Sequence, residues 1–197
     1  MRQMGRAMRP AELYFDAAYA ILAEQGHANL KLSAICGRVG VTTGGFYHNF
    51  DSWRDFTGQF LEHWHANQTT RLVGIVVREP DPIVRLRLLL ESAARLPHRA
   101  EAAIRAWSAA DERVAAVQRS VDDERLQVVV ESFRQMSLPP GQARSRGLAG
   151  MYLLIGYELG EAIRDDDALR WGLAMLIDGV DGLGRTNMTN KAVPESR

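Results

Sequence analysis

The chain has 197 residues, of which 46% are apolar and 24% charged, a composition that predicts a folded globular protein. The formal net charge is zero, which removes the simplest electrostatic argument for nucleic-acid binding, although the first 50 residues carry five basic and three acidic side chains. Cys36 is the only cysteine, so an intramolecular disulfide is excluded, and no apolar stretch is long enough to span a membrane. We therefore expect a cytoplasmic protein with no membrane partner.

Three helices are predicted within the first 50 residues. Apolar residues recur at helical spacing over residues 10–25, where Pro10 suits the first turn and Gly26 the stop. The segment "LSAICGRVG" predicts a helix over residues 32–39 that ends at Gly40, with Cys36 on its apolar side as a buried small residue rather than a nucleophile. Thr42 is a good N-cap for a third short helix running towards His48.

The third helix contains two glycines that its propensity does not explain. Gly44 and Gly45 each cost about 1 kcal/mol relative to alanine inside a helix. Short second and third helices joined by a tight glycine turn have the form of a helix-turn-helix DNA reader. In such a reader the third helix approaches the floor of the major groove, so glycines permit close contact while Val41, Phe46 and Phe50 supply packing.

The remainder of the chain also predicts helices. Asp51 and Ser52 are caps for a long helix that carries Phe56, Phe60 and Trp64 on one stripe and continues towards Val76. Residues 79–82, with two prolines, predict a break. Further helices are expected at residues 83–96, 100–109, 111–136, 141–163 and 168–183, the acidic run 165–167 separating the last two. With no strand pattern or internal repeat, we expect an all-α fold that ends in a disordered tail at 186–197.

The segment "ILAEQGHANLKLSAICGRVGVTTGGFYHNF", followed by "DSWRDF", resembles the N-terminal DNA-binding domain of the TetR family of transcriptional regulators. In that family the first helix ends in glycine, an Ile-Ala pair centres the second helix, and a Gly-Val turn precedes a hydroxyl residue. The recognition helix ends in an aromatic residue, tyrosine, two variable positions and phenylalanine. The matching residues are Gly26, Ile35 with Cys36, Gly40 with Val41, Thr42, Phe46, Tyr47 and Phe50. The resemblance implies double-stranded operator DNA as a partner, with Tyr47 donating its hydroxyl to a phosphate.

The resemblance defines a set of expected DNA contacts. These are Lys31, Ser33, Thr42, Thr43, Gly44, Gly45, Tyr47, His48 and Arg54. Two positions depart from the family pattern. Lys31 stands where a hydroxyl residue usually starts the second helix, and it can supply a phosphate contact itself. Trp53 stands where a lysine is usual, so Arg54 is the candidate for the missing positive charge.

The resemblance also implies a C-terminal domain that binds an effector and pairs with a second subunit. We expect a largely apolar small-molecule effector in a pocket formed by Phe60, His63, Trp64, Arg105, Trp107, Phe133, Met136, Met151 and Tyr152. Two apolar stripes with small residues between them independently favour a homodimer. Its interface is expected to contain Leu148, Ile155, Leu159, Leu173, Leu176, Ile177 and Val180. The domains are then 1–52 for DNA binding, 53–185 for effector and dimer, and 186–197 as the tail.

Other readings of the sequence are weaker. A phosphate-binding P-loop is disfavoured because no lysine follows the glycines of "GVTTGGFYHNF". His63 and His65 are two residues apart and therefore lie on different sides of a helix, so no metal site is expected. No cofactor or catalytic residue is expected either. The interpretation is a DNA-binding regulator, with repression relieved by the effector. The alternatives are an all-α enzyme that uses the C-terminal cavity, and a DNA binder that answers to a protein partner.

Overall fold

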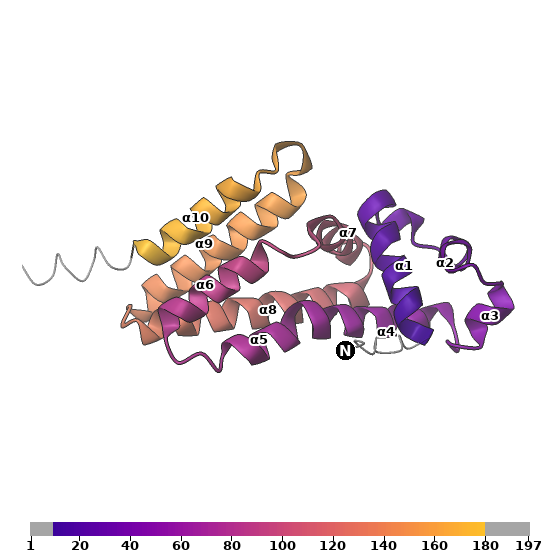
Figure 1. Ribbon diagram of the computed structural model, residues 1–197, viewed down its shortest axis with the longest axis horizontal. Coiled ribbons are helices and arrows are strands. Elements are labelled where there is room, and N and C mark those ends of the chain that lie inside the picture. The colour runs from indigo at the N-terminus through magenta and orange to yellow at the C-terminus, as the bar shows by residue number, and fades with distance from the viewer. Residues whose placement is uncertain (1–9, 180–197) are drawn as a thin grey trace, which may run out of the picture. The chain divides into compact units, whose positions relative to one another are not determined.

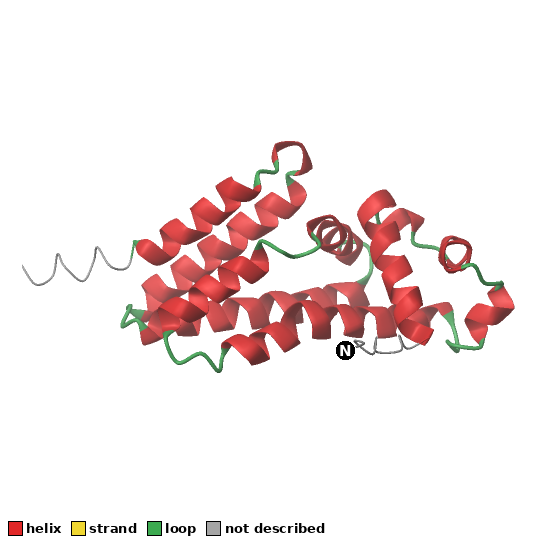
Figure 2. Cartoon of the chain, viewed as in Figure 1, coloured by secondary structure: helices red, strands yellow, loops and turns green. Residues whose placement is uncertain are grey.

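The computed structural model describes residues 10–179, which form helices and loops without a strand (Figure 2). The prediction of an all-α fold is confirmed. In chain order the helices are α1 (Pro10–Gln25), η1 (His27–Asn29), α2 (Leu32–Val39), α3 (Thr43–Tyr47), α4 (Trp53–His65), η2 (Ala66–Thr70), α5 (Arg71–Val76), α6 (Pro82–Ala93), α7 (His98–Ser108), α8 (Glu112–Gln135), α9 (Pro140–Leu159), η3 (Glu161–Ile163) and α10 (Asp166–Asp178) (Figure 1). No described helix is both long enough and apolar enough to cross a membrane. Val180 and the expected tail at 186–197 lie outside the described residues.

The chain divides into two compact units. The first comprises Met1–Thr70 and Pro97–Val121, and the second comprises Arg71–Leu96 and Asp122–Arg197. This division follows packing, so α7 and the start of α8 belong with the N-terminal helices. The expected functional boundary between residues 52 and 53 remains a prediction, since a functional domain need not coincide with a packing unit.

The first unit is built around a cluster of aromatic side chains. Phe46, Phe56, Phe60 and Trp64 are each 0% exposed, and α1 contributes Phe15 from the opposite side. The ring centroids of Phe46 and Phe56 lie 5.4 Å apart in an edge-to-face arrangement, which is a favourable geometry for aromatic pairs. The predicted stripe on α4 therefore lies in the core and fixes the segment that precedes it.

Local signals in the sequence define the first helices well. The bounds of α1 and α2 agree with the predicted 10–25 and 32–39, and Cys36 is buried as expected. Thr42 caps α3 and Ser52 caps α4, each accepting a hydrogen bond from the backbone N–H three residues later. The apolar pattern misplaces one residue, since Leu13 is 46% exposed on the side of α1 away from the core.

Two predicted elements differ from the structure. The long helix from residue 53 is not regular up to Val76, because residues 66–70 form a π-helical turn between α4 and α5. The acidic run at 165–167 is not only a separator. Asp165 is the N-cap of α10, accepting from the backbone N–H of Ala168, and the next two aspartates lie in the first helical turn. Negative charge is favourable at that end of a helix.

The second unit has its own core and side-chain hydrogen bonds between its helices. Figure 1 shows α9 and α10 running side by side, and α6 also contacts α10. The core contains Leu86, Phe133, Leu138, Ala143 and Ile177. On α9, the guanidinium of Arg146 donates to the backbone carbonyls of Leu176 and Gly179, at 2.5 and 3.2 Å, and so caps the C-terminal end of α10.

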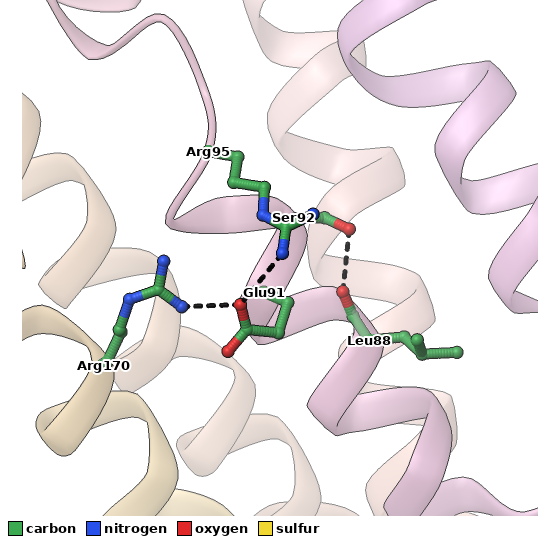
Figure 3. A network of polar contacts seen from close by, with 5 residues as sticks. All are labelled: Leu88, Glu91, Ser92, Arg95 and Arg170. Atoms are coloured by element: carbon green, nitrogen blue, oxygen red, sulfur yellow. Dashed lines mark hydrogen bonds and ion pairs between the residues drawn. The ribbon is translucent and has the colours of Figure 1, made fainter.

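Glu91 is the centre of a polar network that joins α6 to α10 (Figure 3). Its carboxylate lies 2.6 Å from Nη1 of Arg170 and 3.6 Å from Nη2 of Arg95. The hydrogen bond from Arg170 lowers the pKa of the Glu91 carboxyl. Since all three side chains are solvent-accessible, these ion pairs add little stability individually, and only the pair with Arg170 links α6 to α10.

Candidate nucleic-acid interface

The turn between α2 and α3 is made by a residue that must be glycine-like. Gly40 has φ 79° and ψ 33°, in the left-handed region where a side chain is strained. Its backbone N–H and that of Val41 both donate to the carbonyl of Cys36, at 2.9 and 3.0 Å, so the end of α2 is closed. The chain can therefore reverse direction and start α3 within three residues.

The short helix α3 is held by its cap and its aromatic residues rather than by its propensity. Oγ1 of Thr42 accepts from the backbone N–H of Gly45 at 3.1 Å. Phe46 and Phe50 are 0% and 2% exposed and anchor the inner side of the segment in the aromatic cluster. The other face of α3 is consequently left free of packing within the first unit.

The predicted contact residues of this segment are largely exposed to solvent. Thr42, Thr43, Gly44, Tyr47 and His48 are exposed, and Gly45 is half-buried. The side chain of Tyr47 is 47% exposed and its ring packs edge-on against Phe46, with ring centroids 5.3 Å apart. The surface thus combines hydroxyl groups, an imidazole and an accessible glycine backbone, which are the groups that a base edge or a phosphate can meet.

Two flanking cations also lie at the surface. Lys31 precedes α2 and makes no side-chain cap, and Ser33 is exposed in the first turn. Arg54 is exposed in the first turn of α4. Its neighbour Trp53 is half-buried, with ring centroids 5.1 Å from Phe56 and 6.2 Å from Phe46. The departure from lysine at Trp53 therefore extends the aromatic core, which leaves Arg54 as the cation of this turn.

Some predicted pocket residues gather in the first unit around a carboxylate that the sequence pattern does not reveal. Glu101, on α7 and 2% exposed, accepts from Nε1 of Trp64 at 2.6 Å. Burial, and secondarily the charge of Glu101, raise the pKa of the Tyr19 hydroxyl. Phe60 and His63 lie beside Tyr19, with ring centroids at 5.1 and 6.3 Å. Glu101 lies at the same helical positions of α7 as the buried apolar residues Ala100, Ala103 and Ile104. This spacing is the one feature of the sequence that indicates its burial.

The remaining pocket candidates lie on α7 and in the second unit. Trp107 packs against the first core, and Arg105 is half-buried on the same helix. In the second unit Phe133 and Met151 are buried and Met136 packs against Phe133's cluster. Tyr152, by contrast, is 66% exposed on α9, because it faces away from the core that Met151 enters. Among the described residues no group of His, Cys, Asp and Glu is arranged to hold a metal ion.

The predicted dimer residues divide between core and surface. Ile177 is 6% exposed and Leu176 packs against the second core, so both already serve the single chain. Leu148, Ile155 and Leu173 are half-buried. Leu159 is 58% exposed, and it is accompanied on α9 and α10 by Trp171 and Met175, which are 68% and 53% exposed. Large apolar side chains in this number are unusual on a solvated face.

Comparison with known proteins supports DNA binding by the N-terminal segment. Residues 15–56 match the model of the bacterial regulatory proteins of the tetR family. No curated protein sequence matches the chain significantly. A transcriptional regulator from Rhodococcus sp. Rha1 has a similar structure, with a TM-score of 0.72 and 17% identity over 87% of this chain and 96% of that one.

Two further similar structures contain ligands. One is a putative transcriptional regulator from Saccharomonospora viridis in complex with choline, with a TM-score of 0.70 and 17% identity over 85% of this chain and 95% of that one. The other is the transcriptional regulator FadR from Bacillus subtilis in complex with stearoyl-CoA, with a TM-score of 0.62 and 16% identity over 85% and 98%. At these identities the likeness is one of fold.

The fold and the exposed residues of the segment 42–48 support a DNA-binding transcriptional regulator of the helix-turn-helix class. Its N-terminal segment, residues 15–56, matches the tetR-family model, and the described residues share their fold with solved transcriptional regulators. The matched segment and the shared fold therefore favour a regulator over an all-α enzyme.

Proposed function

We propose that this chain is a homodimeric repressor in the cytoplasm that binds operator DNA through α3 and releases it when a small-molecule effector binds. One observation carries the proposal: in and beside α3, Thr42, Thr43, Gly44, Tyr47 and His48 are exposed to solvent, while Phe46 and Phe50 anchor the segment in the core. A helix supported from behind and free in front is suited to enter a major groove.

The surface around α3 supports the same mode of binding. Lys31, Arg54 and the Tyr47 hydroxyl can neutralise or contact phosphates on either side of the helix, which orients it on the duplex. Thr42, Thr43 and His48 then meet the base edges. Phosphate contacts supply affinity that depends on salt, and base contacts supply the choice of site.

A second copy of the chain is the partner that suits the apolar face of α9 and α10. This face comprises Tyr152, Leu159, Trp171 and Met175, and a self-complementary pairing would remove all four side chains of each copy from water. A dimer also presents two copies of α3, which matches half-sites spaced by about 34–36 Å or a multiple of that distance. Tyr152 then belongs to the dimer face in this proposal.

Control by an effector is supported by the two ligand-bound structures of the same fold, whose ligands, choline and stearoyl-CoA, differ greatly in size and polarity. Phe60, His63, Trp64, Arg105, Trp107, Phe133, Met136 and Met151 are the proposed effector contacts. An effector that prefers a conformation with wrongly spaced recognition helices lowers the DNA affinity by its differential affinity for the two conformations.

A shift assay on DNA upstream of the chain's own gene tests the proposal. We expect the dimer to retard this DNA at low salt, with an affinity that falls as salt rises. Metabolites are then screened by the fluorescence of Trp64 and Trp107 in a Trp53→Phe/Trp171→Phe background, and hits are tested for release of DNA. Absence of salt-dependent binding would contradict the proposal that α3 binds DNA. If no small molecule releases the DNA and a protein partner does, the proposal of a small-molecule effector is contradicted.

A further inference from the structure

Tyr14 reaches from α1 to the recognition helix. Its side chain is 4% exposed, and its ring packs edge-on against Phe46 and Phe50, with ring centroids 5.8 and 5.2 Å apart. The ring is thus part of the aromatic cluster that supports α3 from behind. Its hydroxyl lies at the rim of the cluster, 3.5 Å from the backbone carbonyl of Gly45.

Asn49 completes the contact from the other side. Its amide Nδ2 donates to the hydroxyl oxygen of Tyr14 at 3.1 Å and to the carbonyl of Gly45 at 3.1 Å. An amide group has two N–H donors, and both are used here. The three groups form a clamp that joins α1, the middle of α3 and the residue that follows its last turn.

This clamp lies where α3 lacks stability of its own. The helix has five residues, two of them glycine, and it is far shorter than a helix that is stable alone. Thr42 secures its first turn through the N–H of Gly45. The Asn49 amide secures the carbonyl of the same glycine, so Gly45 is fixed through both of its backbone polar groups.

We propose that Tyr14 and Asn49 are positioning residues for the recognition helix, which act by holding the Gly45 backbone in the orientation that DNA requires. The inference rests on the proposed function and adds residues to it, since neither side chain is among the expected DNA contacts. The apparent affinity of a site scales with the fraction of molecules in the competent conformation, and the clamp raises that fraction.

Positioning is separated from direct contact with DNA at Tyr14, which is buried on α1. Asn49 is exposed, although its amide donates twice within the protein. Tyr14→Phe removes only the hydroxyl and keeps the ring contacts with Phe46 and Phe50. A loss of operator binding in this variant therefore reports on the clamp, because the surface that faces DNA is unchanged.

The test is a double-mutant cycle with Tyr14→Phe and Asn49→Ala, measured as affinity for operator and for unrelated DNA. We expect each variant to lose about 3- to 10-fold in operator affinity, the size expected from one or two hydrogen bonds, with a smaller loss on unrelated DNA. The double variant should be weaker than either single variant but by less than the product of the two losses, because both changes remove the Tyr14–Asn49 hydrogen bond. Tyr19→Phe is the matched control, because it removes another hydroxyl of α1 that lies away from α3. This variant should bind operator normally.

Hydrogen exchange of the Phe46, His48 and Phe50 amides supplies a second measurement that does not use DNA. We expect these amides to exchange faster in Tyr14→Phe while those of α7 are unchanged. Normal operator affinity in Tyr14→Phe, or additive losses in the double variant, would overturn the clamp. Failure of the unmodified protein to bind DNA would contradict the proposed function, and unchanged amide exchange in α3 would then overturn the clamp separately.

Discussion

A Cβ atom added at Gly44 would lie 3.7 Å from Oγ1 of Thr42, and one added at Gly45 would lie 3.5 Å from Cβ of Val41. Both are ordinary van der Waals distances, and neither glycine has a positive φ. The fold of the first unit therefore accommodates alanine at either position. The glycines lower the helix propensity of α3 without a structural benefit inside the chain, which favours close approach of DNA as their role.

Gly44→Ala should consequently separate stability from function. We expect the free energy of unfolding to rise by about 1 kcal/mol in chemical denaturation, while operator affinity falls about 10-fold or more because a methyl group enters the DNA surface. Gly58→Ala in α4, where an added Cβ meets nothing within 4 Å, is the control that should gain stability without losing affinity. Operator binding by Gly44→Ala as tight as the control's would contradict close approach.

Arg54 is expected to carry the charge that Trp53 cannot. In Arg54→Ala the slope of log affinity against log salt should become shallower by about 0.9, the contribution of one phosphate contact. Arg119→Ala, which removes an exposed arginine of α8 from the same unit, should leave the slope unchanged. A slope that is equal in both variants would show that Arg54, in the first turn of α4, makes no phosphate contact.

At the scale of elements, the C-terminal end of α8 contains a residue under backbone strain. Ser137 has φ 64°, the only positive φ of a non-glycine residue among those described. It lies at the helix stop, where its N–H donates to the carbonyl of Arg134 and the next N–H, that of Leu138, donates to Phe133. This is the position that glycine usually occupies, because the left-handed conformation costs other residues about 1–2 kcal/mol.

Ser137→Gly should therefore stabilise the second unit. We expect the free energy of unfolding to increase by about 1 kcal/mol or slightly less, since glycine also loses more backbone entropy on folding. The measurement is a denaturant midpoint at unchanged slope. Ser137→Ala keeps the strain and should leave the midpoint close to that of the natural sequence. Equal midpoints for the glycine and alanine variants would mean that this conformation costs nothing here.

The helix ends that the sequence predicts are those with local causes. Thr42, Ser52, Gly26 and Gly40 act through bonds or dihedral angles of their own turn, so α1, α2, α3 and the start of α4 could be predicted nearly to the residue. The π-helical turn at residues 66–70 could not, because it carries no local cap or stop signal. The Trp64–Glu101 hydrogen bond spans 37 residues and was equally inaccessible to a local pattern.

At the scale of the whole molecule, apolar stripes do not distinguish a core from an interface. The stripes of α9 and α10 contain Ile177, which is buried within the chain, and Trp171, which is exposed. Both are apolar residues at helical spacing, and only packing separates them. The sequence could therefore predict the two helices that form the apolar surface, whereas the residues that remain for a partner emerge from the structure.

Trp171→Glu should disrupt the dimer. A charge placed in a desolvated apolar interface is strongly unfavourable, and the symmetry of a dimer introduces it twice. We expect the dissociation constant of the dimer, measured by analytical ultracentrifugation, to rise by about 30-fold or more. Operator affinity should fall in parallel. Ile75→Glu changes another exposed apolar residue, on α5, and should leave the mass unchanged. A fully dimeric Trp171→Glu variant would contradict the proposed interface.

The central claim, that the exposed face of α3 reads operator DNA, is tested most directly by comparing Thr43→Ala and Tyr47→Phe with the natural sequence. The measurement is fluorescence anisotropy on the chain's own upstream DNA and on unrelated DNA at several salt concentrations. Tyr47→Phe should weaken binding to both DNAs by a similar factor, because a phosphate contact is lost, and Thr43→Ala should reduce the preference for the upstream DNA. Unchanged binding in both variants, or no preference in the natural sequence, would contradict the account.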